Sequence, residues 1–270
     1  MNKSALSRPD SNLGGNIGMV QTLRKPEIIN IVRREGKVTV DHLVEVFGVT
    51  PQTIRRDLLD LAHSGQLDRV HGGAILPSNT VNIGYSERRE LNQSVKVDIA
   101  RSCVQKIPND CSLFLNIGTT TEAVAVELLN HQGLMVVTNN MNIANILSVS
   151  PDIEVVVTGG QLRRSDGGLI GDLTKDTIRQ FRFDYAVIGC SALREDGDIL
   201  DFDIREVGVS KSIIEQSETV LLVSDSSKFE RKAPVKIASM GEVDVFVTDK
   251  GLPKACAKFC NELGTQVMYA

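Results

Sequence analysis

The chain has 270 residues, of which 41% are hydrophobic and 24% are charged, a composition typical of a globular protein. Its formal net charge is -4, tryptophan is absent and aromatic residues make up 4%, which excludes base stacking on aromatic side chains as the main mode of nucleic-acid binding. No apolar run approaches the roughly 18 residues that a membrane-spanning helix needs, so we expect no contact with a membrane.

Residues 1–19 lack the apolar segment of a secretion signal, and we expect them to form a flexible tail. Met19 is an alternative to Met1 as the natural start. The five cysteines include Cys256 and Cys260, which are four residues apart, but no histidine or further cysteine accompanies them at zinc spacing. We therefore expect reduced thiols in a cytoplasmic protein, with no metal and no cofactor.

Residues 20–76 have the pattern of three short helices followed by a hairpin. The segment KPEIINIVRREG predicts a first helix that ends at Gly36, and TVDHLVEVFGV predicts a second. Gly48 follows in a tight turn, where a glycine takes a positive φ without strain. Thr50 is a natural N-cap and Pro51 a natural first residue, so a third helix is expected to begin there.

The third helix presents a polar face, because Ile54, Leu58 and Leu61 recur at the spacing of a buried stripe. Arginine and glutamine at the start of such a helix can reach guanine and adenine in the major groove. The alternating segment QLDRVHGGAIL predicts a hairpin wing beside it. The residues expected to contact double-stranded DNA are Thr50, Gln52, Thr53, Arg55, Arg56, Arg69 and His71.

An alternative interpretation treats Arg55 and Arg56 as a solvated face, paired with Asp57 and Asp60. The context of three helices and a hairpin favours DNA binding. The acidic net charge does not exclude it, because charges act within a Debye length of about 8–10 Å and their placement matters more than their sum. Since residues 24–71 are nearly neutral, we expect a homo-oligomer, a dimer or tetramer, to supply enough phosphate contacts.

Residues 77–93 form a polar connector, and residues 94–270 alternate helical stretches with short β-branched strands such as CSLFLNIG, GLMVVTNN and DIEVVVTGG. Strands that are apolar on both faces indicate a parallel sheet covered by helices, so the fold class is α/β. Small ligands bind where the strands of such a sheet end. Glycines and hydroxyls at three successive strand ends predict a phosphate site there.

A loop at residues 166–168 can close over this site, and two lysines can supply positive charge. The residues expected to bind the ligand are Gly118, Thr119, Thr120, Thr121, Asn139, Asn140, Gly159, Gly160, Asp166, Gly167, Gly168, Asp203, Lys211 and Lys228.

The rival hypothesis is catalysis. Asp203, Glu206 and Lys211 could act as acid and base in an aldose–ketose isomerisation, which would make the chain an isomerase-like enzyme with a DNA-binding appendage. A salt-linked helix surface or a contact to a sugar hydroxyl explains the same residues without chemistry. An architectural DNA-binding protein is a third possibility, but it needs no phosphate pocket.

The segment TVDHLVEVFGVTPQTIRRDLLDLAHSGQLDRVHGGA resembles the N-terminal signature of the DeoR family of bacterial transcription repressors, and the resemblance extends over about residues 20–249. It implies a winged helix-turn-helix followed by a sensor domain similar to sugar-phosphate isomerases. The resemblance, which includes the motifs NIGTTTEAVA, ILDFDIREV and DSSKFERKAPV, implies glycerol 3-phosphate as the inducer, with a sugar phosphate or amino-sugar phosphate as alternatives. We therefore expect a cytoplasmic repressor that a phosphorylated metabolite releases from operator DNA.

Overall fold

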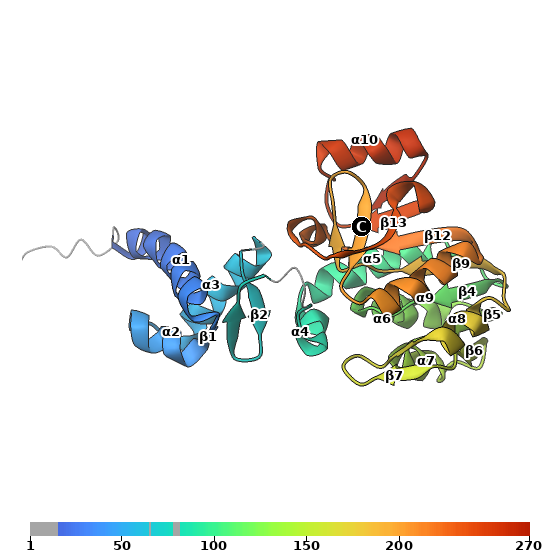
Figure 1. Ribbon diagram of the computed structural model, residues 1–270, viewed down its shortest axis with the longest axis horizontal. Helices are drawn as coiled ribbons and strands as arrows, with labels where there is room; N and C mark the ends of the chain where they lie inside the picture. Colours follow the sequence, from blue (N-terminus) through green and yellow to red (C-terminus); the bar gives the residue numbers. More distant parts are fainter. Residues whose placement is uncertain (1–15, 65, 78–81) are drawn as a thin grey trace, which may run out of the picture. The chain divides into compact units, whose positions relative to one another are not determined.

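The computed structural model describes residues 16–64, 66–77 and 82–270 (Figure 1). The chain divides into two compact units, Met1–Leu76 and Pro77–Ala270, and each is described by itself. Within the described residues, no helix combines the length and the apolar character that crossing a bilayer requires.

The first unit combines three helices with a small antiparallel sheet of strand order β1-β3-β2. Its elements are α1 (Asn16–Glu35), β1 (Lys37–Thr39), α2 (Val40–Phe47), α3 (Pro51–His63), β2 (Asp68–Val70) and β3 (Gly73–Ile75). The three helices pack around one apolar core that includes Ile28, Leu43, Ile54 and Leu58. The helix-turn-helix and hairpin predicted from the sequence are thereby confirmed.

The sheet has one strand more than the sequence predicted. Val38 of β1 pairs with Ala74 of β3, so the wing is three-stranded rather than a simple hairpin. A side chain at Gly73 would place its Cβ 1.8 Å from the Val38 carbonyl oxygen. The close approach of β1 to β3 therefore requires glycine at this position.

Two predicted segment boundaries differ from the structure. Residues 16–19 form the first turn of α1, whereas the sequence suggested a tail up to residue 19; residues 1–15 lie outside the described residues. The polar connector predicted for residues 77–93 contains a helix, α4 (Tyr85–Glu90). The sequence did not predict this helix because YSERRE has no apolar stripe. Hydrogen bonds of its polar side chains, rather than apolar packing, anchor it.

The second unit is built on a seven-stranded parallel sheet of strand order β15-β14-β12-β9-β4-β5-β6 (Figure 1). Its strands are β4 (Ser112–Leu115), β5 (Leu134–Thr138), β6 (Ile153–Val157), β9 (Phe183–Ile188), β12 (Ser217–Val223), β14 (Val245–Thr248) and β15 (Gln266–Tyr269). The helices are α5 (Gln93–Val104), α6 (Thr119–Glu127), α7 (Met141–Leu147), α8 (Asp172–Ile178), α9 (Ile204–Glu215) and α10 (Lys254–Leu263). The predicted α/β class is confirmed.

Both faces of the large sheet are buried, as the continuous apolar strands predicted. Leu113 and Leu115 of β4 pack with α5, α6 and α7 in one core. Phe114, which points to the opposite face, packs with α8, α9 and α10 in the other, where its ring lies 5.3 Å from that of Phe183.

The order of the strands in the sheet reverses between β4 and β9. It first adds β5 and β6 on one side of β4, then places β9, β12, β14 and β15 on the other side. The loops that follow β4 and β9 therefore leave the sheet in opposite directions. Ligands of open parallel sheets bind at such a switch point.

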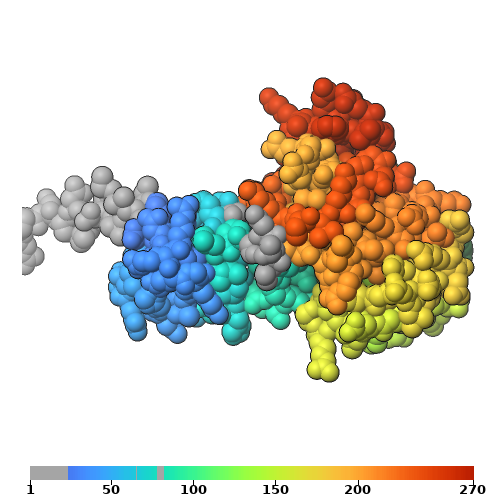
Figure 2. Space-filling model, viewed as in Figure 1, coloured from blue at the N-terminus to red at the C-terminus, as the bar shows by residue number. Residues whose placement is uncertain are grey.

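Two small antiparallel sheets complete the unit. One is a hairpin of β7 (Gln161–Arg163) and β8 (Gly168–Ile170), which stands out as a yellow projection in Figure 2. The other joins β10 (Ala192–Leu193), β11 (Asp198–Asp201) and β13 (Val235–Ser239). Three 3₁₀ turns are described as well: η1 (Leu128–Asn130), η2 (Ser226–Glu230) and η3 (Met240–Glu242).

Candidate functional site

The start of α3 is fixed by two threonines and a proline. The Thr50 hydroxyl accepts a hydrogen bond from the backbone N–H of Thr53 at 3.2 Å, and the two threonine hydroxyls are 2.9 Å apart. Pro51 is the first helical residue, and Gly48 ends α2 in the left-handed conformation with φ 63°. The turn between α2 and α3 is thus determined by local sequence.

The exposed face of α3 carries the predicted DNA-contacting side chains. Ile54 and Leu58 are buried, whereas Gln52, Arg55 and Arg56 are exposed on the face that they leave free. Thr53 is half-buried beside the N-cap. This arrangement places two guanidinium groups and an amide at the N-terminal half of one helix, where they are available to an external partner.

The carboxylates of α3 form ion pairs with basic side chains of α1, not with the two exposed arginines. Asp57 is completely buried and pairs with Arg24 at 2.5 Å, while Asp60 pairs with Lys25 at 2.6 Å. The hydrogen bond from Lys25 lowers the pKa of Asp60. Neither exposed arginine forms an ion pair within the described part of the chain. The carboxylates that the alternative interpretation assigned to the two arginines thus pair with α1, and Arg56 acts on Asp60 only through its charge, which also lowers the pKa of Asp60.

The remaining predicted DNA contacts lie on the wing. Arg69 is half-buried on β2, and His71 is exposed in the two-residue turn between β2 and β3.

The switch point of the second unit holds a helix start with unpaired backbone donors. The first helical bond of α6 runs from the Glu122 N–H to the Gly118 carbonyl, so the three N–H groups before it have no helical acceptor. Gly118 offers no capping side chain. Uncapped amides at a helix start attract an anion, and the helix dipole adds to the attraction.

The three threonines of this loop have different roles. The Thr121 hydroxyl is buried and donates within its own loop, lying 2.7 Å from the carbonyl oxygens of Asn116 and Gly118. Thr120 is also buried. Thr119 is half-buried, and its hydroxyl donates to the carbonyl of Arg88 at 3.4 Å, close to the limit for such a bond. Thr119 thus has the hydroxyl that is most easily redirected.

Two lysines lie together near Asp225. Lys96 of α5 is 5% exposed, and burial together with the charge of Lys228 lowers its pKa to about 8. Burial and the charge of Arg231 likewise lower the pKa of Lys228. Asp225, which accepts a hydrogen bond from Asn92 at 3.2 Å, is the carboxylate acting on both ammonium groups. Lys96 is buried and Lys228 half-buried, and the charge of one carboxylate acts on both, so a further anion would stabilise the two ammonium groups.

Lys96 was not predicted as a site residue, although a sequence signal existed. Lys96, Ile99, Ala100 and Cys103 all lie on the buried face of α5. Their spacing of i, i+3, i+4 and i+7 puts a charged residue into an apolar stripe. A lysine in such a stripe needs either a partner or a ligand.

The predicted carboxylate contacts belong to a network around Arg163. Arg163 lies 2.7 Å from Asp166, 3.5 Å from Asp203 and 2.6 Å from Glu206. Burial opposes ionisation of Asp166, but the hydrogen bonds and charge of Arg163 hold its pKa below the usual range. Asp203 also caps α9 by accepting from the Arg205 N–H. Asp203 and Glu206, two of the three acid and base candidates of the isomerase hypothesis, are therefore engaged in ion pairs, whereas the third, Lys211, is exposed on α9.

The predicted asparagines hold neighbouring loops. Asn140 donates to Glu122 at 3.2 Å and accepts from the Asn142 N–H, while Asn139 donates to the Leu169 carbonyl. The Oδ1 atom of Asn139 is buried without a hydrogen bond. These contacts tie α7 and β8 to the strand end.

The other predicted ligand contacts are spread over the same edge of the sheet. Gly159 and Gly160 follow β6, the edge strand, where the Thr174 hydroxyl donates to the Gly159 carbonyl. Gly167 and Gly168 lie in the β7–β8 hairpin, and Lys211 is exposed on α9. The structure thus brings Thr119 and Lys96 together at the Arg88 carbonyl, where the charge of Lys228 acts on Lys96, and shows no such grouping for Gly159, Gly160 or Lys211.

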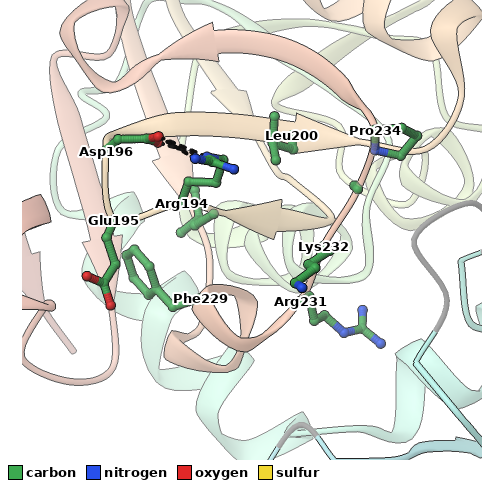
Figure 3. A pocket seen from close by; sticks show the side chains of 10 residues that line it. Arg194, Glu195, Asp196, Leu200, Phe229, Arg231, Lys232 and Pro234 are labelled. Atoms are coloured by element: carbon green, nitrogen blue, oxygen red, sulfur yellow. Dashed lines mark hydrogen bonds and ion pairs between the residues drawn. The ribbon is translucent and has the colours of Figure 1, made fainter.

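A pocket of about 600 Å³ is lined by residues of β10, β11 and the segment between η2 and β13 (Figure 3). Its lining includes Leu193, Leu200 and Arg194, which pairs with Asp196 at 2.7 Å. None of the predicted ligand contacts lines it.

A winged helix-turn-helix joined in one chain to a ligand-sensing parallel sheet defines the class of the protein as a ligand-responsive transcription regulator. Residues 24–80 match the DeoR-like helix-turn-helix domain, and residues 91–250 match the DeoR C terminal sensor domain. The chain belongs to the DeoR family.

Relatives match over nearly their whole length. The glycerol-3-phosphate regulon repressor of Escherichia coli (strain K12) is 48% identical over 235 residues, which are 87% of this chain and 93% of the relative. The repressor of the same name from Haemophilus influenzae is 42% identical over 93% of this chain and 97% of its own. The chain is therefore a transcription repressor rather than an enzyme, and it acts on DNA.

Similarity to solved structures is more distant. Ribose 5-phosphate isomerase A from Methanocaldococcus jannaschii matches with a TM-score of 0.39 and 14% identity, over 51% of this chain and 55% of that one. The eIF2B beta subunit from Chaetomium thermophilum matches with a TM-score of 0.43 and 12% identity, over 84% of this chain and 63% of that one.

Proposed function

We propose that this repressor binds operator DNA through α3 and the wing and is released when glycerol 3-phosphate binds at the start of α6. The observation that carries the proposal is the combination of free helix amides at Thr119–Thr121 with the buried Lys96 and the half-buried Lys228. The names of the two relatives given above support glycerol 3-phosphate over other phosphorylated metabolites.

The DNA contacts follow from the exposed face of α3. Arg55, Arg56 and Gln52 reach base edges, while Thr50, Thr53, Arg69 and His71 contact the phosphate backbone or the minor groove. A single DNA-binding unit has few basic side chains for phosphate contacts. We therefore propose that a homo-oligomer, a dimer or tetramer, binds two half-sites of the operator in the cytoplasm.

The ligand contacts follow from the charge of a phosphate monoester. Its charge of about -1.5 to -2 at pH 7 matches two ammonium groups and a helix N-terminus. Thr119 donates its hydroxyl, Thr120 its amide, and Lys96 and Lys228 their charge. Asp203 and the loop Asn139–Asn140 are proposed contacts for the ligand hydroxyls, and the hairpin at residues 166–168 is the proposed cover.

Thermal unfolding of the full chain tests this site. At a glycerol 3-phosphate concentration of 100 times its dissociation constant, linkage stabilises the native state by about 2.7 kcal/mol, which raises the melting temperature by roughly 5–10 °C. Glycerol and inorganic phosphate should give smaller shifts at equal concentration. Thr119→Ala and Lys96→Met should reduce the shift, whereas Thr177→Ala on α8 should retain it. If the melting-temperature shift is equal in the wild type and in all three variants, Thr119 and Lys96 are excluded from the site.

A further inference from the structure

Helix α4 is the first helix of the second unit along the chain, and polar contacts anchor it. The Tyr85 hydroxyl donates to Glu122 at 2.8 Å and accepts from Asn142 at 3.0 Å. Burial and the Glu122 contact raise the pKa of Tyr85 to about 12, so this hydroxyl keeps its proton. Its bond connects α4 directly to α6, the helix whose start forms the proposed phosphate site.

The Arg88 side chain provides a second anchor. Its guanidinium donates to Asp166 at 3.1 Å, and Asp166 is also held by Arg163 at 2.7 Å. The Asp166 side chain is only 3% exposed, so this ion pair is screened little by solvent. The contact ties α4 to the β7–β8 hairpin.

The Arg88 carbonyl provides the third anchor, and its two donors both belong to the proposed phosphate site. It accepts from the Thr119 hydroxyl at 3.4 Å and from the Lys96 ammonium group. The main chain of α4 and a bound phosphate would therefore compete for the same donors.

The competition is unequal for the two donors. A threonine hydroxyl has one hydrogen, so Thr119 can donate either to the Arg88 carbonyl or to a phosphate oxygen. An ammonium group has three hydrogens, so Lys96 can serve both acceptors. A charged phosphate oxygen is the stronger acceptor, and the 3.4 Å bond to the carbonyl is already long. Phosphate binding thus removes the Thr119 anchor.

We infer that Arg88 is the positioning residue through which the ligand site acts on α4, and that ligand binding loosens α4 from the sensor sheet. The inference rests on the proposed phosphate site. In the free protein α4 is docked and the DNA-competent state is favoured; with ligand bound, Thr119 leaves the Arg88 carbonyl and the undocked state is favoured. By linkage, a change that weakens docking of α4 without removing a ligand contact should tighten the ligand and weaken the operator.

The test uses Tyr85→Phe and Arg88→Lys in the full chain, because neither substitution removes a proposed ligand contact or the positive charge that Arg88 places near the lysines of the site. Calorimetry should show glycerol 3-phosphate binding about two- to tenfold tighter in both variants, the equivalent of one hydrogen bond. Binding to DNA selected by the wild type from a random-sequence pool should weaken by a smaller factor, because the docked state predominates in the free protein. Arg89→Lys, on the exposed side of the same helix, is the matched control and should change neither.

A purely structural role for these residues would leave ligand affinity unchanged or reduce it, so either result overturns the inference. Hydrogen exchange of the wild type provides a check without substitutions: α4 amides should exchange faster at saturating glycerol 3-phosphate, and unchanged or slower exchange contradicts the inference. If the wild type binds no phosphorylated metabolite, the proposed function fails as well. If it binds one while α4 exchange stays constant, only the present inference fails.

Discussion

Arg24 of α1 and Asp57 of α3 form an ion pair in which both side chains are buried, with 7% and 0% of their surfaces exposed. The pair fixes the rotation of α3 about its own axis, because Asp57 must face α1. Arg55 and Arg56 then face away from the core. A contact inside the domain thus determines which side of the helix is available to DNA.

Breaking this pair should destabilise the DNA-binding unit. Asp57→Asn leaves a buried guanidinium without a counter-charge, at a cost of about 3–5 kcal/mol. Hydrogen exchange of α3 amides in the full chain measures the effect. The double replacement Arg24→Met with Asp57→Leu should recover most of the loss, since both charges are removed together. Equal protection in Asp57→Asn and the wild type would show that the pair contributes little.

The two exposed arginines should dominate operator affinity. Arg55→Ala and Arg56→Ala should each weaken specific binding by about 1–3 kcal/mol, because each removes a donor pair for a guanine edge. Fluorescence anisotropy with selected operator DNA measures this loss. Arg34→Ala, an exposed arginine of α1 that pairs with Glu35, serves as the control and should have a small effect. Unchanged affinity in both α3 variants would contradict the assignment of α3 as the reading helix.

Lys96 sets a pH window for ligand binding. Its pKa is lowered to about 8, so the free protein loses this charge as the pH rises through that value. The ligand phosphate keeps its second negative charge above about pH 6. The dissociation constant should therefore be smallest between about pH 6 and 8 and should rise above pH 8, where binding takes up a proton. Calorimetry in buffers of different ionisation enthalpy measures this uptake.

The same lowered pKa has a consequence for the unliganded chain. Between about 8 and the ordinary value of 10.5, the unfolded chain holds a proton that folded Lys96 has lost. Stability should therefore rise with pH across this window, and Lys96→Met should reduce the rise; Lys228, whose pKa is also lowered, contributes to what remains. For ligand binding, a dissociation constant of glycerol 3-phosphate that stays the same from pH 7 to pH 9 would exclude Lys96 from the site.

Glu206 should destabilise the sensor unit at alkaline pH. Burial and the charge of Asp201 raise its pKa to about 7, although Arg163 lies at 2.6 Å. The folded pKa lies above the ordinary 4.5, so ionisation of Glu206 destabilises the folded state. This destabilisation is absent below pH 4.5 and complete above about pH 7. Glu206→Gln should raise the urea midpoint at pH 8 and leave it nearly unchanged at pH 4.5.

The control for this comparison is Glu218→Gln, which alters an exposed carboxylate. Arg163 keeps Asp166 and Asp203 as partners in the Glu206 variant. Loss of stability at both pH values would mean that the ion pair outweighs the burial of the carboxylate.

Local signals in the sequence were sufficient for the helix-turn-helix. Gly48, Thr50 and Pro51 determine a turn and a helix start within four residues, and the structure shows each in the expected role. The apolar strands were equally informative, because burial on both faces leaves few choices other than a covered parallel sheet.

Features that depend on distant residues were not predictable in this way. The third strand of the wing is only three residues long and pairs with residues 73–75, beyond two helices. Helix α4 is held by partners such as Glu122 and Asp166, which are remote in sequence. The repulsion between Lys96 and Lys228 likewise depends on how the fold places α5 and η2.

The most direct test of a repressor with separate DNA and ligand units is the operator dissociation constant with and without glycerol 3-phosphate, at constant ionic strength and with equimolar inorganic sulfate as the control for screening. We predict that glycerol 3-phosphate raises this constant about 5–150-fold, the usual range of allosteric coupling, and that sulfate does not. An operator affinity that is the same in both solutions would contradict the account.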